Sequence, residues 1–103
     1  MKTTSRIMTA QDIYNDITSH IKKSSYRASE WYAGITKNVE QRLFNDHNVS
    51  KENGWWIHRS ANTSNDARMV EEALLKWGCD GGVGGGDDAI YIYAYLKTAN
   101  TRR

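Results

Sequence analysis

Apolar residues recur every four positions near the start of the chain. Ile13, Ile17 and Ile21 form one stripe, which is the spacing of an amphipathic helix. Just before them, residues 9–12 read Thr-Ala-Gln-Asp, a capping-box pattern with Asp in place of the usual Glu or Gln. The pattern predicts a first helix over residues 9–24.

Three later segments have the composition of β-strands. Residues 31–36 and 55–61 both begin with aromatic side chains and contain β-branched ones. Residues 89–97 alternate tyrosine with aliphatic side chains, and this period of two is typical of a strand. We therefore predict three strands, the last of which carries its tyrosines on one face.

Two further helices are expected between these strands. A polar turn at Lys37 and Asn38 precedes a helix-like run over residues 39–47, which Asn38 can cap. The second helix covers residues 66–77 and begins after a cap at Ser64 or Asn65. Its apolar face consists of Met69, Val70, Ala73, Leu74 and Trp77. The expected order is α-β-α-β-α-β.

Length and composition limit the kind of protein. A chain of 103 residues fits one domain, and we expect residues 1–8 and 98–103 to be flexible. The net charge of +2 is compatible with a nucleic-acid partner without requiring one. Cys79 is the only cysteine, which excludes an internal disulfide and favours a reducing compartment. No long apolar segment occurs, so a cytoplasmic protein without a membrane span is expected.

The candidate chemistry lies between residues 31 and 47. The strand carries the hydroxyl of Tyr32, and the following helix carries the guanidinium of Arg42 and the imidazole of His47. A strand-to-helix corner can bring these groups together, and they suit attack on a phosphodiester. Taken singly, Tyr32 is a core aromatic residue, Arg42 is a surface residue paired with Asp46, and His47 is a polar helix end.

Taken together, these residues resemble the GIY-YIG nuclease family. The segment Tyr32-Ala33-Gly34-Ile35-Thr36 is similar to the second half of the family signature, and Arg42, Leu43 and His47 follow at the family's spacing. On the last helix, Ala67, Glu71 and Leu74 resemble the helix that carries the family's metal-binding glutamate. The resemblance covers roughly residues 30–75.

The resemblance implies both a fold and an activity. The fold is α/β in the broad sense (α+β), a small three-stranded, mostly antiparallel sheet flanked by three helices. The activity is divalent-metal-dependent endonuclease cleavage of DNA phosphodiester bonds. Tyr32 would activate or position water, Arg42 would stabilise phosphate charge, and His47 would assist proton transfer and hold the tyrosine. Glu71 would bind one Mg²⁺ or Mn²⁺ ion.

One part of the family signature is missing. The GIY motif should precede the segment at Tyr32, but no such motif occurs there. We hypothesise that the last strand takes the place of the missing strand, which gives a rearranged strand order. Tyr91, Tyr93 or Tyr95 would then supply the absent tyrosine, and the sequence does not choose among them. A last strand placed away from Tyr32 would contradict this hypothesis.

Other residues are candidates for phosphate or nucleic-acid binding. Gly34, Lys37 and Arg59 lie in or near the expected site, although His58 and Arg59 must point to opposite faces of their strand. The glycine-rich loop that contains Gly84, Gly85 and Gly86 is either an anion-binding nest or a tight connector. It lacks the Lys-Ser/Thr ending of a P-loop.

A second class of function also fits the sequence. The same scaffold could be a non-catalytic module that binds a nucleotide or nucleic acid, for example a phage protein that counters a host defence. The missing GIY motif and the glycine loop motivate this alternative. The expected partner is DNA or a nucleotide, and the protein is expected to be a monomer or a homodimer.

Overall fold

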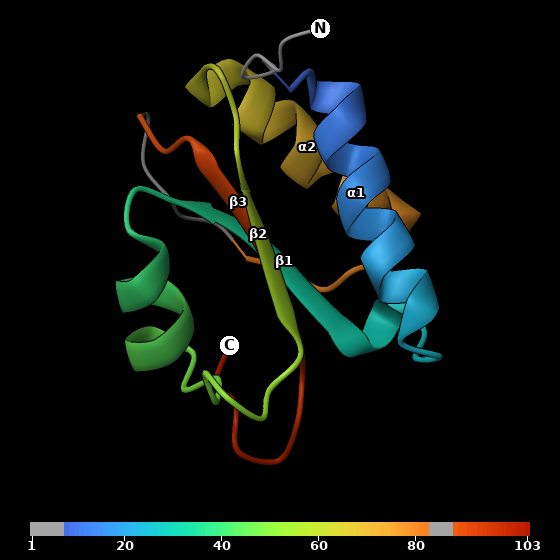
Figure 1. Cartoon of the computed structure of the whole chain (residues 1–103), viewed down its shortest axis with the longest axis vertical. Coiled ribbons are helices and arrows are strands. Elements are labelled where there is room, and N and C mark those ends of the chain that lie inside the picture. The colour runs from blue at the N-terminus through green and yellow to red at the C-terminus, as the bar shows by residue number, and fades with distance from the viewer. Residues whose placement is uncertain (1–7, 83–87) are drawn as a thin grey trace, which may run out of the picture.

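The sheet has its last strand in the middle. The computed structural model describes residues 8–82 and 88–103, which contain β1 (Trp31–Thr36), β2 (Trp56–Ser60) and β3 (Tyr91–Leu96). The strand order is β1-β3-β2, and both pairings are antiparallel (Figure 1). The predicted fold class, a small antiparallel sheet of three strands flanked by helices, is confirmed.

Helices cover the two faces of the sheet unequally. The long helices α1 (Ala10–Lys23) and α2 (Ser64–Trp77) pack together on one face. The short helical segment η2 (Gln41–Asp46) lies on the other side of the sheet (Figure 1). A 3-10 turn, η1 (Ala28–Glu30), leads into β1. The sheet therefore separates a large apolar layer from a smaller, more polar one.

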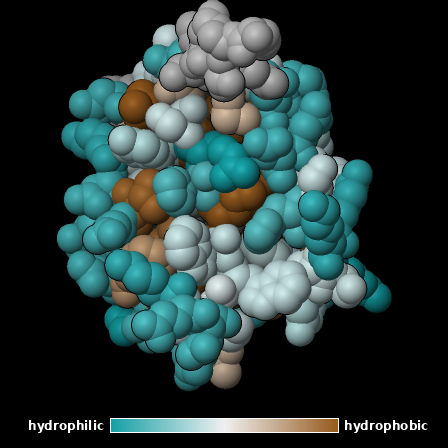
Figure 2. Space-filling view, viewed as in Figure 1, coloured by the Kyte–Doolittle hydropathy of each residue, from teal (hydrophilic) through white to brown (hydrophobic). Residues whose placement is uncertain are grey.

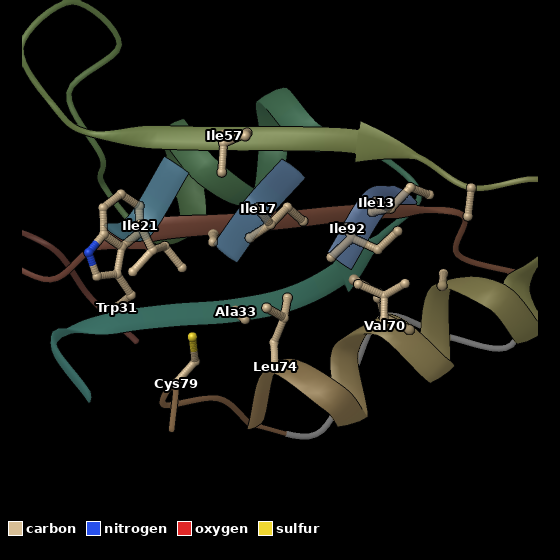
Figure 3. Close-up of a cluster of buried hydrophobic side chains, with 14 of the residues drawn as sticks. Ile13, Ile17, Ile21, Trp31, Ala33, Ile57, Val70, Leu74, Cys79 and Ile92 are labelled. Atoms are coloured by element: carbon tan, nitrogen blue, oxygen red, sulfur yellow. The ribbon is translucent and has the colours of Figure 1, made fainter. Parts of the chain in front are cut away.

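The main core fills the layer between the sheet and the two long helices. Figure 3 shows side chains from α1 and α2 meeting side chains from the three strands. Burial of these apolar groups is the main source of stability in a domain of this size. The largest of them include Ile13, Ile17, Ile21, Trp31, Val70, Leu74 and Ile92. In the space-filling view, most of the outline is hydrophilic, and apolar side chains surface chiefly in the middle (Figure 2).

Capping residues define where the two long helices begin. The predicted capping box of α1 is present, with Thr9 and Asp12 each accepting from the other's backbone N–H. For α2 the predicted cap at Ser64 or Asn65 is wrong. Thr63 is extended, and its hydroxyl accepts from the backbone N–H of Asp66 at 3.0 Å. A threonine at this position satisfies an N–H that the first turn leaves free.

The helix predicted over residues 39–47 is shorter and wider than expected. Its central part, η2, is a π-helix, in which the backbone N–H of His47 bonds to the carbonyl of Arg42 at 2.9 Å. Such single π-turns occur often at functional sites. This bond holds the backbone of His47 at the end of η2.

The C-terminal residues fold back onto this same segment. Thr98 and Thr101 form a hydrogen-bonded turn, and the backbone N–H of Arg102 bonds to the carbonyl of His47 at 2.7 Å.

Within the described residues, no helix has the length and apolar character needed to cross a membrane.

Candidate functional site

The tyrosines of β3 lie on the face of the sheet away from the two long helices. The register pairs Tyr93 with Gly34 and Tyr95 with Tyr32. Tyr32 also belongs to a second cluster of buried apolar residues on this face, together with Tyr93 and Tyr95. The hypothesis that the last strand lies beside Tyr32 therefore survives its structural test.

His47 is held at both ring nitrogens by hydrogen bonds. Its Nδ1 is 2.6 Å from the carbonyl oxygen of Arg102, and its Nε2 is 2.7 Å from the hydroxyl of Tyr93. A carbonyl oxygen can only accept, so Nδ1 carries the proton and Nε2 accepts from the Tyr93 hydroxyl. Tyr95 donates its own hydroxyl to the same carbonyl at 2.9 Å. The result is a directed chain from Tyr93 through His47 to the backbone.

Tyr32 contacts this chain through its ring. Its ring centroid lies 4.8 Å from that of His47 and 5.3 Å from that of Tyr95, with which it stacks. From the resemblance we expect His47 to hold the family tyrosine, for which Tyr32 is the candidate. In the structure the hydroxyl that His47 binds is that of Tyr93, and Tyr32 packs beside the pair.

Gly34 makes room for the Tyr93 hydroxyl. A Cβ atom at this position would lie 2.6 Å from the Tyr93 hydroxyl oxygen and 2.8 Å from its Cζ. Real side chains do not approach this closely, so a glycine is needed opposite Tyr93. Tyr91, whose partners in the register are Thr36 and Ser60, lines the adjacent groove instead.

Two charged residues from other elements act on the tyrosines. Burial is the main cause that raises the pKa of Tyr32 and of Tyr93 above the usual value of a phenol. The positive charge of Arg42, on η2, lowers both pKa values, and the negative charge of Glu71, on α2, raises them. The guanidinium of Arg42 is 3.7 Å from the carboxylate of Asp46, and a third of its side chain is exposed. Arg42 and Glu71 thus lie within electrostatic range of the same two phenols.

The pair at the centre is much less accessible than its charged margin. Tyr93 is 2% exposed and His47 is 3% exposed, whereas Tyr32 is 9% exposed. Glu71 is partly buried, and its burial raises the pKa of its carboxyl group. A large ligand can therefore reach Arg42 and the edge near Tyr32, whereas Tyr93 and His47 lie beneath this surface.

One predicted site residue lies elsewhere. Arg59 is on the face covered by the long helices, and its Nε bonds to the carboxylate of Asp16 at 3.0 Å. The register places His58, not Arg59, beside Tyr93. Arg59 is therefore removed from the predicted phosphate-binding set, because adjacent strand residues point to opposite faces.

The remaining predicted residues lie at the margin or cannot be placed. Tyr91 and Lys37 line a groove next to the tyrosines, and Lys37 pairs with Asp88 at 3.3 Å. Gly84, Gly85 and Gly86 lie outside the described residues. Cys79 is buried, which raises its pKa to about 11 and makes its thiol a poor nucleophile.

One contributor to the site was missed, and the face of another was left open. The carbonyl of Arg102 fixes the proton of His47, but a backbone group leaves no signal in the sequence. His58 and Trp56 form an aromatic margin whose face could only be assigned once the register with β3 was known. The sequence shows that His58 and Arg59 point to opposite faces of their strand. Knowledge of the partner strand decides which of the two faces the site.

The donor set at the site fits an ion that keeps most of its water. Among the residues that the structure describes, no three His, Cys, Asp or Glu side chains gather into a metal cage. Asp80 has its carboxylate engaged by Lys97 at 3.1 Å and Arg103 at 3.2 Å. Glu71 remains as the carboxylate beside the tyrosines. Mg²⁺ is commonly bound by one or two carboxylates together with water and substrate phosphates, so Glu71 and a phosphate would suffice.

Comparisons of this chain with protein-family models, with curated proteins and with solved structures find no match.

The burial of neutral His47 predicts a pH dependence of stability. Burial is the main cause that lowers its pKa below the usual value of about 6.5. At a pH between the lowered pKa of His47 in the folded protein and its usual pKa in the unfolded chain, the unfolded chain binds more protons. The free energy of unfolding therefore rises with pH and levels off above about 6.5. Urea unfolding across this range should show a smaller rise for His47→Gln than for the wild type. His20 and His58 contribute equally to both proteins, so identical pH profiles would contradict a buried neutral imidazole.

Proposed function

We propose that this protein is a small divalent-metal-dependent endonuclease that cleaves phosphodiester bonds of DNA and resembles the GIY-YIG nucleases. The observation that carries the proposal is the hydrogen-bonded chain from Tyr93 through His47 to the Arg102 carbonyl. A phenol bonded to a neutral imidazole can accept a proton on one side while it releases one on the other.

The pair suits activation of a water molecule. Water donates a proton to the hydroxyl oxygen of Tyr93 as the Tyr93 proton passes to Nε2 of His47, which becomes an imidazolium. The hydroxide formed attacks phosphorus, the bond from phosphorus to the leaving oxygen breaks, and that oxygen takes a proton from solvent. His47 then returns its extra proton to solvent, which restores the neutral imidazole. The Arg102 carbonyl holds the imidazolium through Nδ1–H. Tyr32 packs against both rings and keeps them in place.

Arg42 and Glu71 supply the charges that phosphate cleavage requires. Arg42 can donate two hydrogen bonds to phosphate oxygens and oppose the negative charge that develops on them. Glu71 would hold the divalent ion, which when bound neutralises charge on phosphate oxygens. The proposed setting is the cytoplasm, with DNA as the partner and a monomer or homodimer as the active form.

The first test is cleavage of supercoiled plasmid and short DNA with Mg²⁺, Mn²⁺ or EDTA. We expect nicking that EDTA abolishes and that Arg42→Ala reduces. Glu71→Gln should shift the Mg²⁺ requirement to higher concentrations. Its neighbour Glu72 is exposed, so Glu72→Gln is the matched control and should leave the requirement unchanged. A folded wild type that cuts no DNA under any metal condition would contradict the proposal.

A second function is favoured by one observation. Tyr93 and His47 are nearly inaccessible to solvent. A buried pair of this kind suits a structural role beneath a binding surface better than direct contact with a substrate. On this alternative the protein is a non-catalytic module that binds a nucleotide or nucleic acid. Ligand binding without turnover by a folded wild type would support it.

A further inference from the structure

A groove adjoins the tyrosine face. It has a volume of about 410 Å³, within the range of small-ligand sites, and lies between the start of η2 and strands β2 and β3. It is open to solvent and combines aromatic with basic side chains. Those that matter here are Lys37, Phe44, Lys51, Trp56, His58 and Tyr91.

The aromatic side chains of the groove form a platform. Trp56 and His58 project from the same face of β2, and their rings are nearly parallel, with an interplanar angle of 10° and centroids 6.0 Å apart. Phe44 meets Trp56 edge-on at 5.2 Å and supports it from η2. His58 is exposed, so one π-face at the end of this row is open to a planar ligand.

The groove carries two lysines, each in an exposed ion pair with a carboxylate. Lys37 pairs with Asp88 at 3.3 Å, and Lys51 pairs with Glu40 at 3.5 Å. These four side chains are more than half exposed, and ion pairs of this kind contribute little to stability. A phosphate can therefore compete for both lysines at small cost, while the aromatic platform takes an attached ring.

The groove continues into the candidate site. His58 is the partner of Tyr93 in the register, and Tyr91 lies two residues from Tyr93 on the same face of β3. Two residues of a strand span about 7 Å, so Tyr91 lies about that far from Tyr93. Because His58 is opposite Tyr93, a group stacked at His58 lies next to the Tyr93–His47 pair. One strand of nucleic acid can occupy both places.

We infer that this groove receives an unpaired base of the DNA strand that is cut, with a phosphate of that strand between Lys37 and Lys51. The inference rests on the proposed function and adds a substrate class to it. Bases inside a duplex are stacked on both faces, so only a single-stranded, bulged or flipped nucleotide can offer its ring to the platform. The protein is thus specific for single strands or local unpaired sites.

Binding can be measured without cleavage. In EDTA, fluorescence anisotropy would compare a short labelled single strand, the same strand with an abasic residue, and the matching duplex. We expect the intact single strand to bind most tightly. His58→Ala should weaken its binding roughly 5- to 150-fold, the equivalent of one lost base stack. Trp55→Ala is the matched control, because Trp55 is exposed outside the groove and packs on Tyr26, and it should leave binding unchanged.

The outcomes separate this inference from the nuclease proposal. Equal or tighter binding of the duplex, or equal effects of His58→Ala and Trp55→Ala, would overturn it even if the protein cuts DNA. Binding of free dTMP as tight as that of the strand would also overturn it, since the occupant would then be a free nucleotide. Single-strand preference lost in His58→Ala would support the groove even if no cleavage is found.

Discussion

Replacing Tyr93 with phenylalanine is expected to lower DNA cleavage by about 10²- to 10⁴-fold, the usual contribution of a positioned acid or base. The substitution removes only the hydroxyl that donates to Nε2 of His47 at 2.7 Å. Without it, water has no phenol oxygen to which it can pass a proton. His47 also loses its donor, and an unsatisfied buried acceptor costs about 1–3 kcal/mol of stability. Plasmid nicking and urea unfolding on the same preparation would measure both effects.

Tyr91→Phe is the matched control for this change. Tyr91 lies on the same strand and the same face, but it lines the groove, and the ring that stacks there survives the substitution. We expect cleavage and stability close to those of the wild type. If Tyr93→Phe and Tyr91→Phe behaved alike, the Tyr93–His47 pair would not be the source of the activity.

Adding a single methyl group at Gly34 is expected to damage both the site and the fold. The new Cβ would lie 2.6 Å from the Tyr93 hydroxyl, and Tyr93 cannot easily retreat because it is fully packed in the central strand. Overpacking of this kind typically costs about 1–3 kcal/mol. Gly34→Ala should therefore unfold at lower urea concentration and lose most of its cleavage, because the hydroxyl must leave Nε2 of His47.

A double-mutant cycle would test the cause of this effect. In Gly34→Ala combined with Tyr93→Phe, the closest atom is gone, so the loss of stability should be smaller than the sum of the two single losses. Strict additivity would show that the glycine is needed for another reason. Wild-type cleavage by Gly34→Ala would contradict the placement of Tyr93 altogether.

Local patterns predicted most of the secondary structure because local chemistry determines it. The isoleucine stripe and capping box placed α1, and alternation placed the tyrosines of β3 on one face. The cap of α2 was missed because three neighbouring residues, Thr63, Ser64 and Asn65, are all good caps. The π-turn of η2 was missed because no residue type marks the change from an i−4 to an i−5 hydrogen bond.

The candidate site depended on contacts that sequence spacing does not encode. The sequence pointed to three tyrosines on one face but could not choose among them. In the structure the hydroxyls of Tyr93 and Tyr95 both reach ring nitrogens of His47, and register places Tyr93 opposite a glycine. Register also decides that His58, not Arg59, faces the site. Both facts depend on a pairing between segments far apart in the chain.

The position of β3 has a consequence for synthesis in the cell. This strand is made after β1 and β2, yet it lies between them, so neither outer strand has a strand to pair with until residues 91–96 have left the ribosome. Domains generally fold as units, and the sheet of this one has to wait for its last strand. A nascent or interrupted chain that ends before residue 91 therefore cannot assemble the tyrosine face.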